Sequence, residues 1–213
     1  MADSKSRTII LDKIKKSLQT TTNRPFDNIT QNTQIYQPQN EDLDILFAEQ
    51  FTKMQGQFNY CTSEQDAAEN IAQLCNSKNW QAIFIGNPQI QNILSKIPSQ
   101  HFTNNLATSN VSVTFCESLI ARTGSMILSS KSSDGRTTSV YAPAHICIAY
   151  TDQLMYDIKD GIQHLQQKYS NNNIPGMITL ATGPSRTADI EKTLVTGVHG
   201  PKEVYCFLIE RNW

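Results

Sequence analysis

The sequence predicts an α/β fold, because buried strands and amphipathic helices alternate along most of the chain. Short apolar runs such as 80–85 and 204–209 are typical of buried strands. Segments such as 63–74 and 154–168 repeat apolar residues at helical spacing. A helix between two strands returns the chain across the sheet, which makes neighbouring strands parallel. We therefore expect a mostly parallel sheet with helices on both faces.

The N-terminal third begins with an amphipathic pattern and a polar stretch. Residues 5–18 place Ile10, Ile14 and Leu18 among lysines, which predicts a helix. Residues 20–40 contain proline and many Gln, Asn and Thr residues, which indicates a linker or extended arm. Ser63, followed three residues later by an aspartate, predicts a helix start. The elements expected up to residue 97 are helix 5–18, linker 20–40, helix 43–54, strand 58–61, a helix from Ser63, strand 80–85 and helix 87–97.

The rest of the chain has the same close spacing. Asp134-Gly135 is a strong turn signal and predicts an antiparallel hairpin between strands 125–129 and 137–150. The simplest division is an N-terminal helical extension with a polar linker, residues 1–56, and one α/β domain, residues 57–213. The other expected elements are strand 111–116, at most one helical turn at 118–122, helix 154–168 and strands 177–181 and 204–209.

Composition narrows the classes of function. The 213 residues are 17% charged with a net charge of −1, and this argues against binding to nucleic acid or an anionic membrane. The N-terminus lacks the apolar region of a signal peptide, so we expect a cytoplasmic protein. The five cysteines form no Cys-x-x-Cys pair, so we expect buried thiols, no metal site and no cofactor. They are Cys61, Cys75, Cys116, Cys147 and Cys206.

Polar residues are concentrated at 182–191 and 197–201, between two expected strands. Gly183 can turn the chain sharply, and Pro184 fits the first turn of a helix. Ser185 and Thr187 can cap that helix, and Arg186 together with the helix N-terminus can hold an anion. This pattern has two interpretations, a ligand-binding loop or an ordinary capped helix.

The same stretch resembles the lactate utilization protein C family, also called the LUD domain family. Its C-terminal signature is Thr-Gly-Pro-Ser-x-Thr-Ala-Asp-Ile-Glu followed by Gly-Val-His-Gly-Pro. Every fixed position of that pattern is filled in residues 182–191 and 197–201. The resemblance extends back to about Val111 and more loosely to about Phe58. It implies a three-layer fold like that of the sugar-phosphate isomerase and CoA-transferase group.

Weaker matches to the family lie upstream. Residues 121–128 resemble its Ala-Glu-Thr-Gly-Thr segment, with Arg122 in place of the acid and Ser125 in place of the second threonine. Residues 143–146 resemble its Pro-x-His-Ile segment. Ligands of open α/β sheets lie beyond the carboxyl ends of strands, so we expect 123–125 and 182–183 to meet around one cleft. The candidate ligand-binding residues are Thr123, Gly124, Ser125, Thr182, Gly183, Ser185, Arg186 and Thr187.

The candidate catalytic residues are Asp189, His199 and Glu117. Asp189 would lie three residues from Arg186, close enough on a helix to pair with it. His199 lies among glycines and suits proton transfer, or a structural role bonded to Asp189 or a loop carbonyl. Glu117 follows an expected strand, as the nucleophilic glutamate of CoA-transferases of similar fold does. His145, in an apolar strand, is expected to be a core histidine.

Two hypotheses of function remain. The resemblance implies an accessory component of a cytoplasmic L-lactate utilization system that converts L-lactate to pyruvate and whose iron–sulfur proteins would be its partners. The alternative is a stand-alone enzyme of CoA-transferase or isomerase-like fold, which binds an anionic acyl or phosphorylated substrate. Assembly of the chain as a homo-oligomer is left open by the sequence.

Overall fold

The computed structural model describes residues 3–19, 42–132, 137–169, 173–190 and 193–211. It divides into two compact units, Met1–Pro38 and Gln39–Trp213. The described part of the first unit is helix α1 (Asp3–Leu18), which confirms the helix expected there. Ile10, Ile14 and Leu18 of this helix are exposed. The polar stretch at 20–40 lies outside the described residues.

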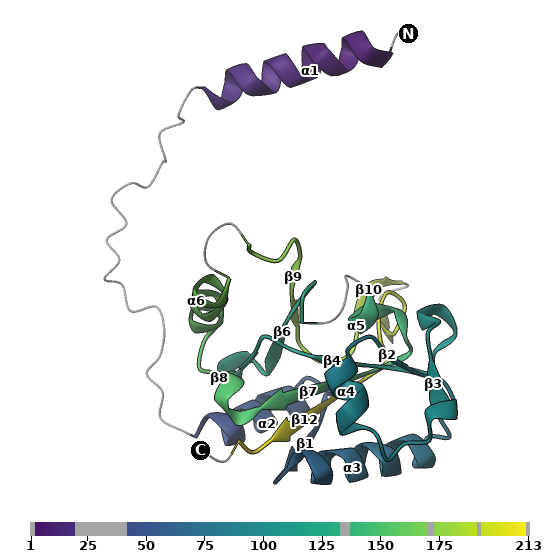
Figure 1. Ribbon diagram of the computed structural model, residues 1–213. Helices are drawn as coiled ribbons and strands as arrows, with labels where there is room; N and C mark the ends of the chain where they lie inside the picture. The colour runs from purple at the N-terminus through teal and green to yellow at the C-terminus, as the bar shows by residue number, and fades with distance from the viewer. Residues whose placement is uncertain (1–2, 20–41, 133–136, 170–172, 191–192, 212–213) are drawn as a thin grey trace. The chain divides into compact units, whose positions relative to one another are not determined.

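A parallel sheet forms the centre of the second unit (Figure 1). Among the described residues it has six strands in the order β1-β12-β7-β4-β2-β3, and each neighbouring pair is parallel. Its central strands are buried on both faces, as their unbroken apolar sequences predict. The strands are β1 (Gln57–Cys61), β2 (Ile83–Ile85), β3 (Phe102–Thr103), β4 (Val111–Phe115), β7 (Ala144–Tyr150) and β12 (Glu203–Ile209).

Helices α3 (Glu64–Ser77) and α4 (Pro88–Ile93) cover one face of this sheet, and α3 runs along its lower side in Figure 1. Ser63 caps α3 by accepting a hydrogen bond from the backbone N–H of Asp66, as predicted. Alternate residues of β12, such as Tyr205 and Phe207, enter the core on this face. The intervening residues enter the core on the other face.

The other face is covered by helix α2 (Leu43–Lys53) and by a second sheet. That sheet has the order β8-β5-β6-β9, and helix α6 (Ile158–Lys168) packs on its outer side. Its strands are β5 (Ser118–Ile120), β6 (Ser125–Ser129), β8 (Leu154–Met155) and β9 (Ile178–Ala181). The predicted three-layer α/β class is confirmed, with this small sheet forming much of the third layer.

Several predicted elements are wrong in detail. β6 pairs with β5 and β9, whereas β7 lies in the parallel sheet between β4 and β12, so the expected hairpin does not form. Asp134-Gly135 lies outside the described residues. The expected strand 137–150 begins with a short helix, α5 (Thr138–Tyr141), before β7. The expected helix at 154–168 starts late because Asp157 caps it at Ile158.

The signature stretch is also not helical. It forms an antiparallel hairpin of β10 (Arg186–Ile190) and β11 (Thr193–Thr196), in which Arg186 lies opposite Thr196. Backbone hydrogen bonds close the base of the hairpin, from Ser185 N–H to the Pro201 carbonyl and from Gly197 N–H to the Ser185 carbonyl, both 2.9 Å long. The helical spacing argument for Arg186 and Asp189 therefore does not apply.

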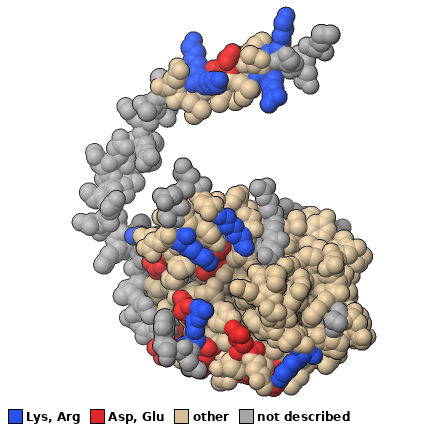
Figure 2. All heavy atoms as spheres, viewed as in Figure 1, with Lys and Arg blue, Asp and Glu red and all other residues tan. Residues whose placement is uncertain are grey.

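The buried thiols and His145 agree with the sequence analysis. All five cysteines are buried and free. The Thr114 hydroxyl lies 2.9 Å from Nε2 of His145, and burial lowers the pKa of that histidine to about 4. None of the described helices is long and apolar enough to cross a membrane. Acidic and basic side chains are interspersed on the visible face of the second unit (Figure 2).

Candidate functional site

The candidate site is a cavity of about 800 Å³ beside the carboxyl ends of the parallel strands. Its lining comes from segments that follow five neighbouring strands of the sheet. This is the usual position of ligands in open α/β sheets, and the volume suits a cofactor-sized molecule. The residues that follow these strands and line the cavity are Glu64 after β1, Asn87 after β2, Glu117 after β4, Asp152 after β7 and Arg211 after β12.

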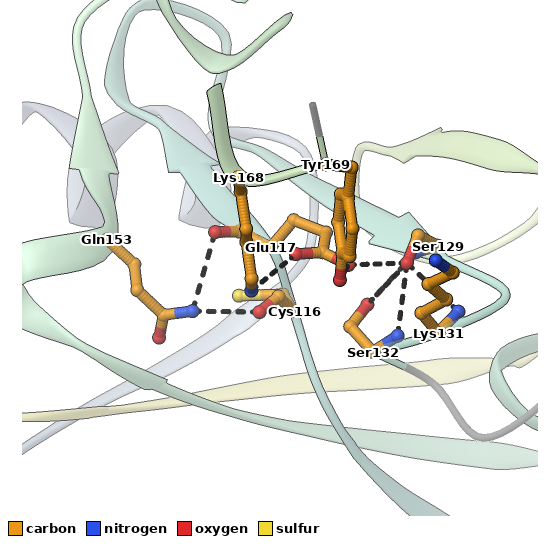
Figure 3. A network of polar contacts seen from close by, with 8 residues as sticks. All are labelled: Cys116, Glu117, Ser129, Lys131, Ser132, Gln153, Lys168 and Tyr169. Atoms are coloured by element: carbon orange, nitrogen blue, oxygen red, sulfur yellow. Dashed lines mark hydrogen bonds and ion pairs between the residues drawn. The ribbon is translucent and has the colours of Figure 1, made fainter. Parts of the chain in front are cut away.

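Glu117 is the centre of a polar network on one wall of this cavity (Figure 3). Its side chain is 0% exposed. One carboxylate oxygen accepts from the Ser129 hydroxyl at 2.5 Å and from the Tyr169 hydroxyl at 3.0 Å. The other accepts from Nζ of Lys168 at 2.8 Å. Glu117 therefore ties the end of β6 and the end of α6 to the end of β4.

Ser129 continues this hydrogen-bond network into the turn that contains Lys131. The Ser129 hydroxyl oxygen accepts from the backbone N–H of Lys131 at 3.1 Å and of Ser132 at 3.0 Å. Nζ of Lys131 donates to the backbone carbonyl and the side-chain oxygen of Asn173, each at 2.7 Å. It also lies 4.6 Å from the centroid of the Tyr169 ring. The turn after β6 is thus held in place at the cavity edge.

The protonation states on this wall follow from these contacts. Burial disfavours the charged Glu117 carboxylate, but hydrogen bonds from Lys168 and Ser129 outweigh it and lower the pKa of Glu117. Burial likewise disfavours the Lys168 ammonium, but Glu117 raises its pKa overall. Burial and the nearby Glu117 charge raise the pKa of Tyr169. At neutral pH Lys168 is therefore an ammonium, Glu117 a carboxylate and Tyr169 a neutral phenol.

A second wall of the cavity is built around Tyr150. Its hydroxyl donates to Glu64 at 2.7 Å, and its ring stacks with Phe115 at a centroid distance of 6.3 Å. The Arg211 guanidinium lies 4.8 Å from the centroid of the same ring and donates to Asp152 at 2.5 Å. This wall combines two carboxylates with one cation and exposes aromatic surface to the cavity.

The ligand-binding residues predicted from the sequence come together at a different place. Ser125 Oγ lies 2.8 Å from Thr123 Oγ1 and 2.7 Å from Thr182 Oγ1, so segments 123–125 and 182–183 do meet. None of the predicted ligand-binding residues is among those that line the cavity described above. Their binding role stays a prediction.

Helix α2 packs closely on both of these segments. A Cβ at Gly124, where φ is +59°, would overlap the backbone of Phe51, and a Cβ at Gly183, where φ is +75°, would overlap the Met54 carbonyl. Glycine is therefore required at both positions for packing. Arg186 is exposed and donates to the sulfur of Met54 at 3.4 Å. Arg122, which replaces the acid of the family pattern, pairs with Asp157 at the N-cap of α6 at 2.5 Å.

The three catalytic candidates fall in different places. Glu117 lines the cavity. His199 is exposed beyond the hairpin, and the backbone of Asp189 lies in β10. His199 is not among the residues that line the cavity, and the side chain of Asp189 lies outside the described part of the chain, so the catalytic roles of both stay predictions.

Sequence reasoning missed most of the charged residues of the cavity. Asp152 and Arg211 could have been found, because each follows a strand whose carboxyl end was predicted correctly. Lys168 and Tyr169 gave no such signal, since they end a helix that reaches Glu117 only through tertiary packing. Among the described residues, no group of three or more His, Cys, Asp or Glu side chains is arranged to hold a metal ion.

The comparisons with known proteins point to one family. The LUD domain family model matches residues 46–209. Lactate utilization protein C of Bacillus subtilis is 35% identical over 104 residues, which are 48% of this chain and 43% of that protein. The protein of the same name from Bacillus licheniformis is 34% identical over 102 residues, 47% of this chain and 42% of that protein. An uncharacterized protein of Neisseria meningitidis is 36% identical over 90 residues, 42% of this chain and 38% of that protein.

These alignments span less than half the length of each relative. A solved structure, of a DUF162 family protein from Deinococcus radiodurans, superimposes with a TM-score of 0.56 at 16% identity. The superimposed region covers 78% of this chain and 96% of the Deinococcus radiodurans chain. At this identity the likeness supports the fold.

Proposed function

The chain belongs to the LUD domain family, and on that ground we propose that it is a component of an L-lactate utilization system. The observation that carries the proposal is the family match over residues 46–209, together with relatives named lactate utilization protein C. In this role the chain would be an accessory component of the oxidation of L-lactate to pyruvate in the cytoplasm.

We further propose that iron–sulfur proteins are its partners in this oxidation. The five cysteines of this chain are buried, and burial raises the pKa of Cys75 to about 11. Cluster ligands must be thiolates, so core thiols of this kind are poor ligands. Partner proteins would carry the clusters and the electrons, and this chain would organise the assembly or bind a small molecule that controls it.

Reconstitution tests this proposal directly. Lactate-dependent dye reduction is measured with purified iron–sulfur partners in the presence and absence of this chain, and with the chain alone. We expect the partners to need the chain and the chain alone to be inactive. Equal rates with and without the chain would contradict a role in lactate oxidation.

One observation favours a second candidate, a stand-alone enzyme for an anionic acyl or phosphorylated substrate. The cavity at the carboxyl ends of the strands is large and polar, and Lys131, Lys168 and Arg211 are among the residues that line it, as such an enzyme requires. The same reconstitution separates the two candidates, because turnover of such a substrate by the isolated chain would favour the enzyme.

A further inference from the structure

We infer that the cavity binds an organic monocarboxylate with an apolar or aromatic body larger than lactate, with its carboxylate against Lys131 and Lys168. The inference names the ligand class of the site in the proposed lactate-utilization component, and in that sense it rests on the proposed function.

The wall of Lys131, Tyr169, Lys168 and Glu117 carries an excess of one positive charge. Lys168 pairs with Glu117, whereas Lys131 pairs with no carboxylate among the described residues and donates to neutral oxygens of Asn173. The two ammonium groups lie 4.6 and 5.5 Å from the centroid of the Tyr169 ring, and Figure 3 shows that ring between them. One negative charge from a ligand would balance this wall, which suits a monocarboxylate better than a polyphosphate.

The wall is fixed before any ligand arrives. Glu117 holds Lys168 and Tyr169, and through Ser129 it holds the backbone of Lys131. Fixed cations bind an anion more tightly than flexible ones, because less side-chain entropy is lost on binding. Glu117 is fully buried, and both of its oxygens accept hydrogen bonds, so we assign it as a positioning residue for the two lysines.

The second wall, around Tyr150, defines the remainder of the ligand. Phe115, Tyr150 and Ile93 supply apolar and aromatic surface, and Glu64 lies here with the Asp152–Arg211 ion pair, so the charges of these three side chains sum to −1. A carboxylate would be repelled by this net negative charge and attracted to the lysines, so the charges orient the ligand. Lactate has six heavy atoms and would leave most of an 800 Å³ cavity empty. A larger body with an apolar or aromatic part would fill the cavity better.

Titration calorimetry at pH 7 and low salt with the full chain tests this inference. The probes are 3-phenylpropanoate, the uncharged 3-phenylpropanamide of the same shape, and L-lactate. We expect the phenylpropanoate to bind at least about tenfold more tightly than the amide, because it gains charge-assisted hydrogen bonds. L-lactate should bind more weakly than phenylpropanoate.

Two variants locate the binding. Lys131→Gln should weaken phenylpropanoate binding about tenfold and leave amide binding unchanged. Lys53→Gln is the matched control, since Lys53 is an exposed lysine that pairs with Glu49 on α2 away from the cavity. Thermal melts of both variants establish that they fold.

Equal affinity for acid and amide, no binding of either probe, or equal binding by the two variants would each overturn the inference. Dye reduction by the reconstituted system, run in parallel with the unmodified chain, distinguishes the two proposals. If the partners need the chain but the chain binds no carboxylate, the ligand assignment fails and the proposed function stands.

Discussion

At the residue scale, Glu117 determines the geometry of the candidate site. A buried carboxylate is stable only if hydrogen bonds replace its water, and Ser129, Tyr169 and Lys168 provide them. We expect Glu117→Gln to lower the free energy of unfolding by about 2 kcal/mol at pH 7, because the charge-assisted bond from Lys168 is lost. Chemical denaturation measures this change, and an unchanged midpoint and slope would contradict it.

The same residue gives a prediction for pH. The pKa of Glu117 is lowered from its ordinary value of 4.5 in the folded protein. Its contribution to stability is therefore complete above pH 4.5 and is lost as the pH falls through the lower folded value. The difference in unfolding free energy between the wild type and Glu117→Gln should shrink as the pH falls from 5 towards 3. A difference that stays constant over this range would show that Glu117 is not charged in the fold.

His145 predicts a second pH effect with a different window. Its pKa is about 4 in the fold and about 6.5 when unfolded, so below pH 6.5 the unfolded chain binds a proton that the folded chain does not. This should remove about 3 kcal/mol of stability between pH 6.5 and pH 4. His145→Gln, which cannot titrate, should show a flatter profile in denaturation series across that window. Parallel profiles would contradict a neutral buried histidine.

The sequence predicted several single-residue features for physical reasons, and one residue of the site. The cap by Ser63, the buried cysteines and the buried His145 are local or composition effects, and each is confirmed. Glu117 was named because it follows a strand. Its partners Lys168 and Tyr169 could not be predicted, since long-range packing of α6 determines that contact and no local pattern encodes it.

At the element scale, close packing against helix α2 explains why the two family segments contain glycine. This helix packs so closely on 123–125 and 182–183 that a side chain at Gly124 or Gly183 would overlap its backbone. Both glycines also have positive φ angles. The segments that sequence reasoning assigned to ligand binding thus have a packing role, and their binding role stays a prediction.

Gly183→Ala should destabilise the protein by at least about 2 kcal/mol, from backbone strain and from overlap with the Met54 carbonyl. The control is Lys53→Ala on the exposed surface of the same helix, which should change stability by less than about 0.5 kcal/mol. Urea denaturation of both variants checks the prediction. Similar losses in the two variants would contradict the close packing of α2.

Most elements were predicted from periodicity, and the errors have identifiable causes. Continuous apolar strands and amphipathic helices gave the correct class and the correct parallel core. Pro184 and the capping residues after it predicted a helix in the signature stretch. Its backbone N–H and C=O groups instead form hydrogen bonds between β10 and β11, in a hairpin. The expected hairpin around Asp134-Gly135 failed because β7 is buried on both faces and pairs on both edges in the parallel sheet.

At the scale of the whole molecule, the order of strands explains where the cavity lies. Five neighbouring parallel strands end at the same edge of the sheet, and each is followed by a segment that contributes polar side chains. The sequence predicts that a site lies at this edge of the sheet, but it does not predict which loops line the site. The sequence therefore supplied the rule for the position of the site, and the tertiary structure supplied most of its residues.

The most direct test of this account is growth on L-lactate of a strain that lacks its own LUD domain protein, complemented with variants of this chain. We predict that the wild type and Lys53→Gln restore growth and that the double variant Lys131→Gln, Lys168→Gln does not, although it accumulates as a folded protein. Full growth with the folded double variant would contradict a functional cavity. Failure of the wild type would contradict a role in lactate utilization.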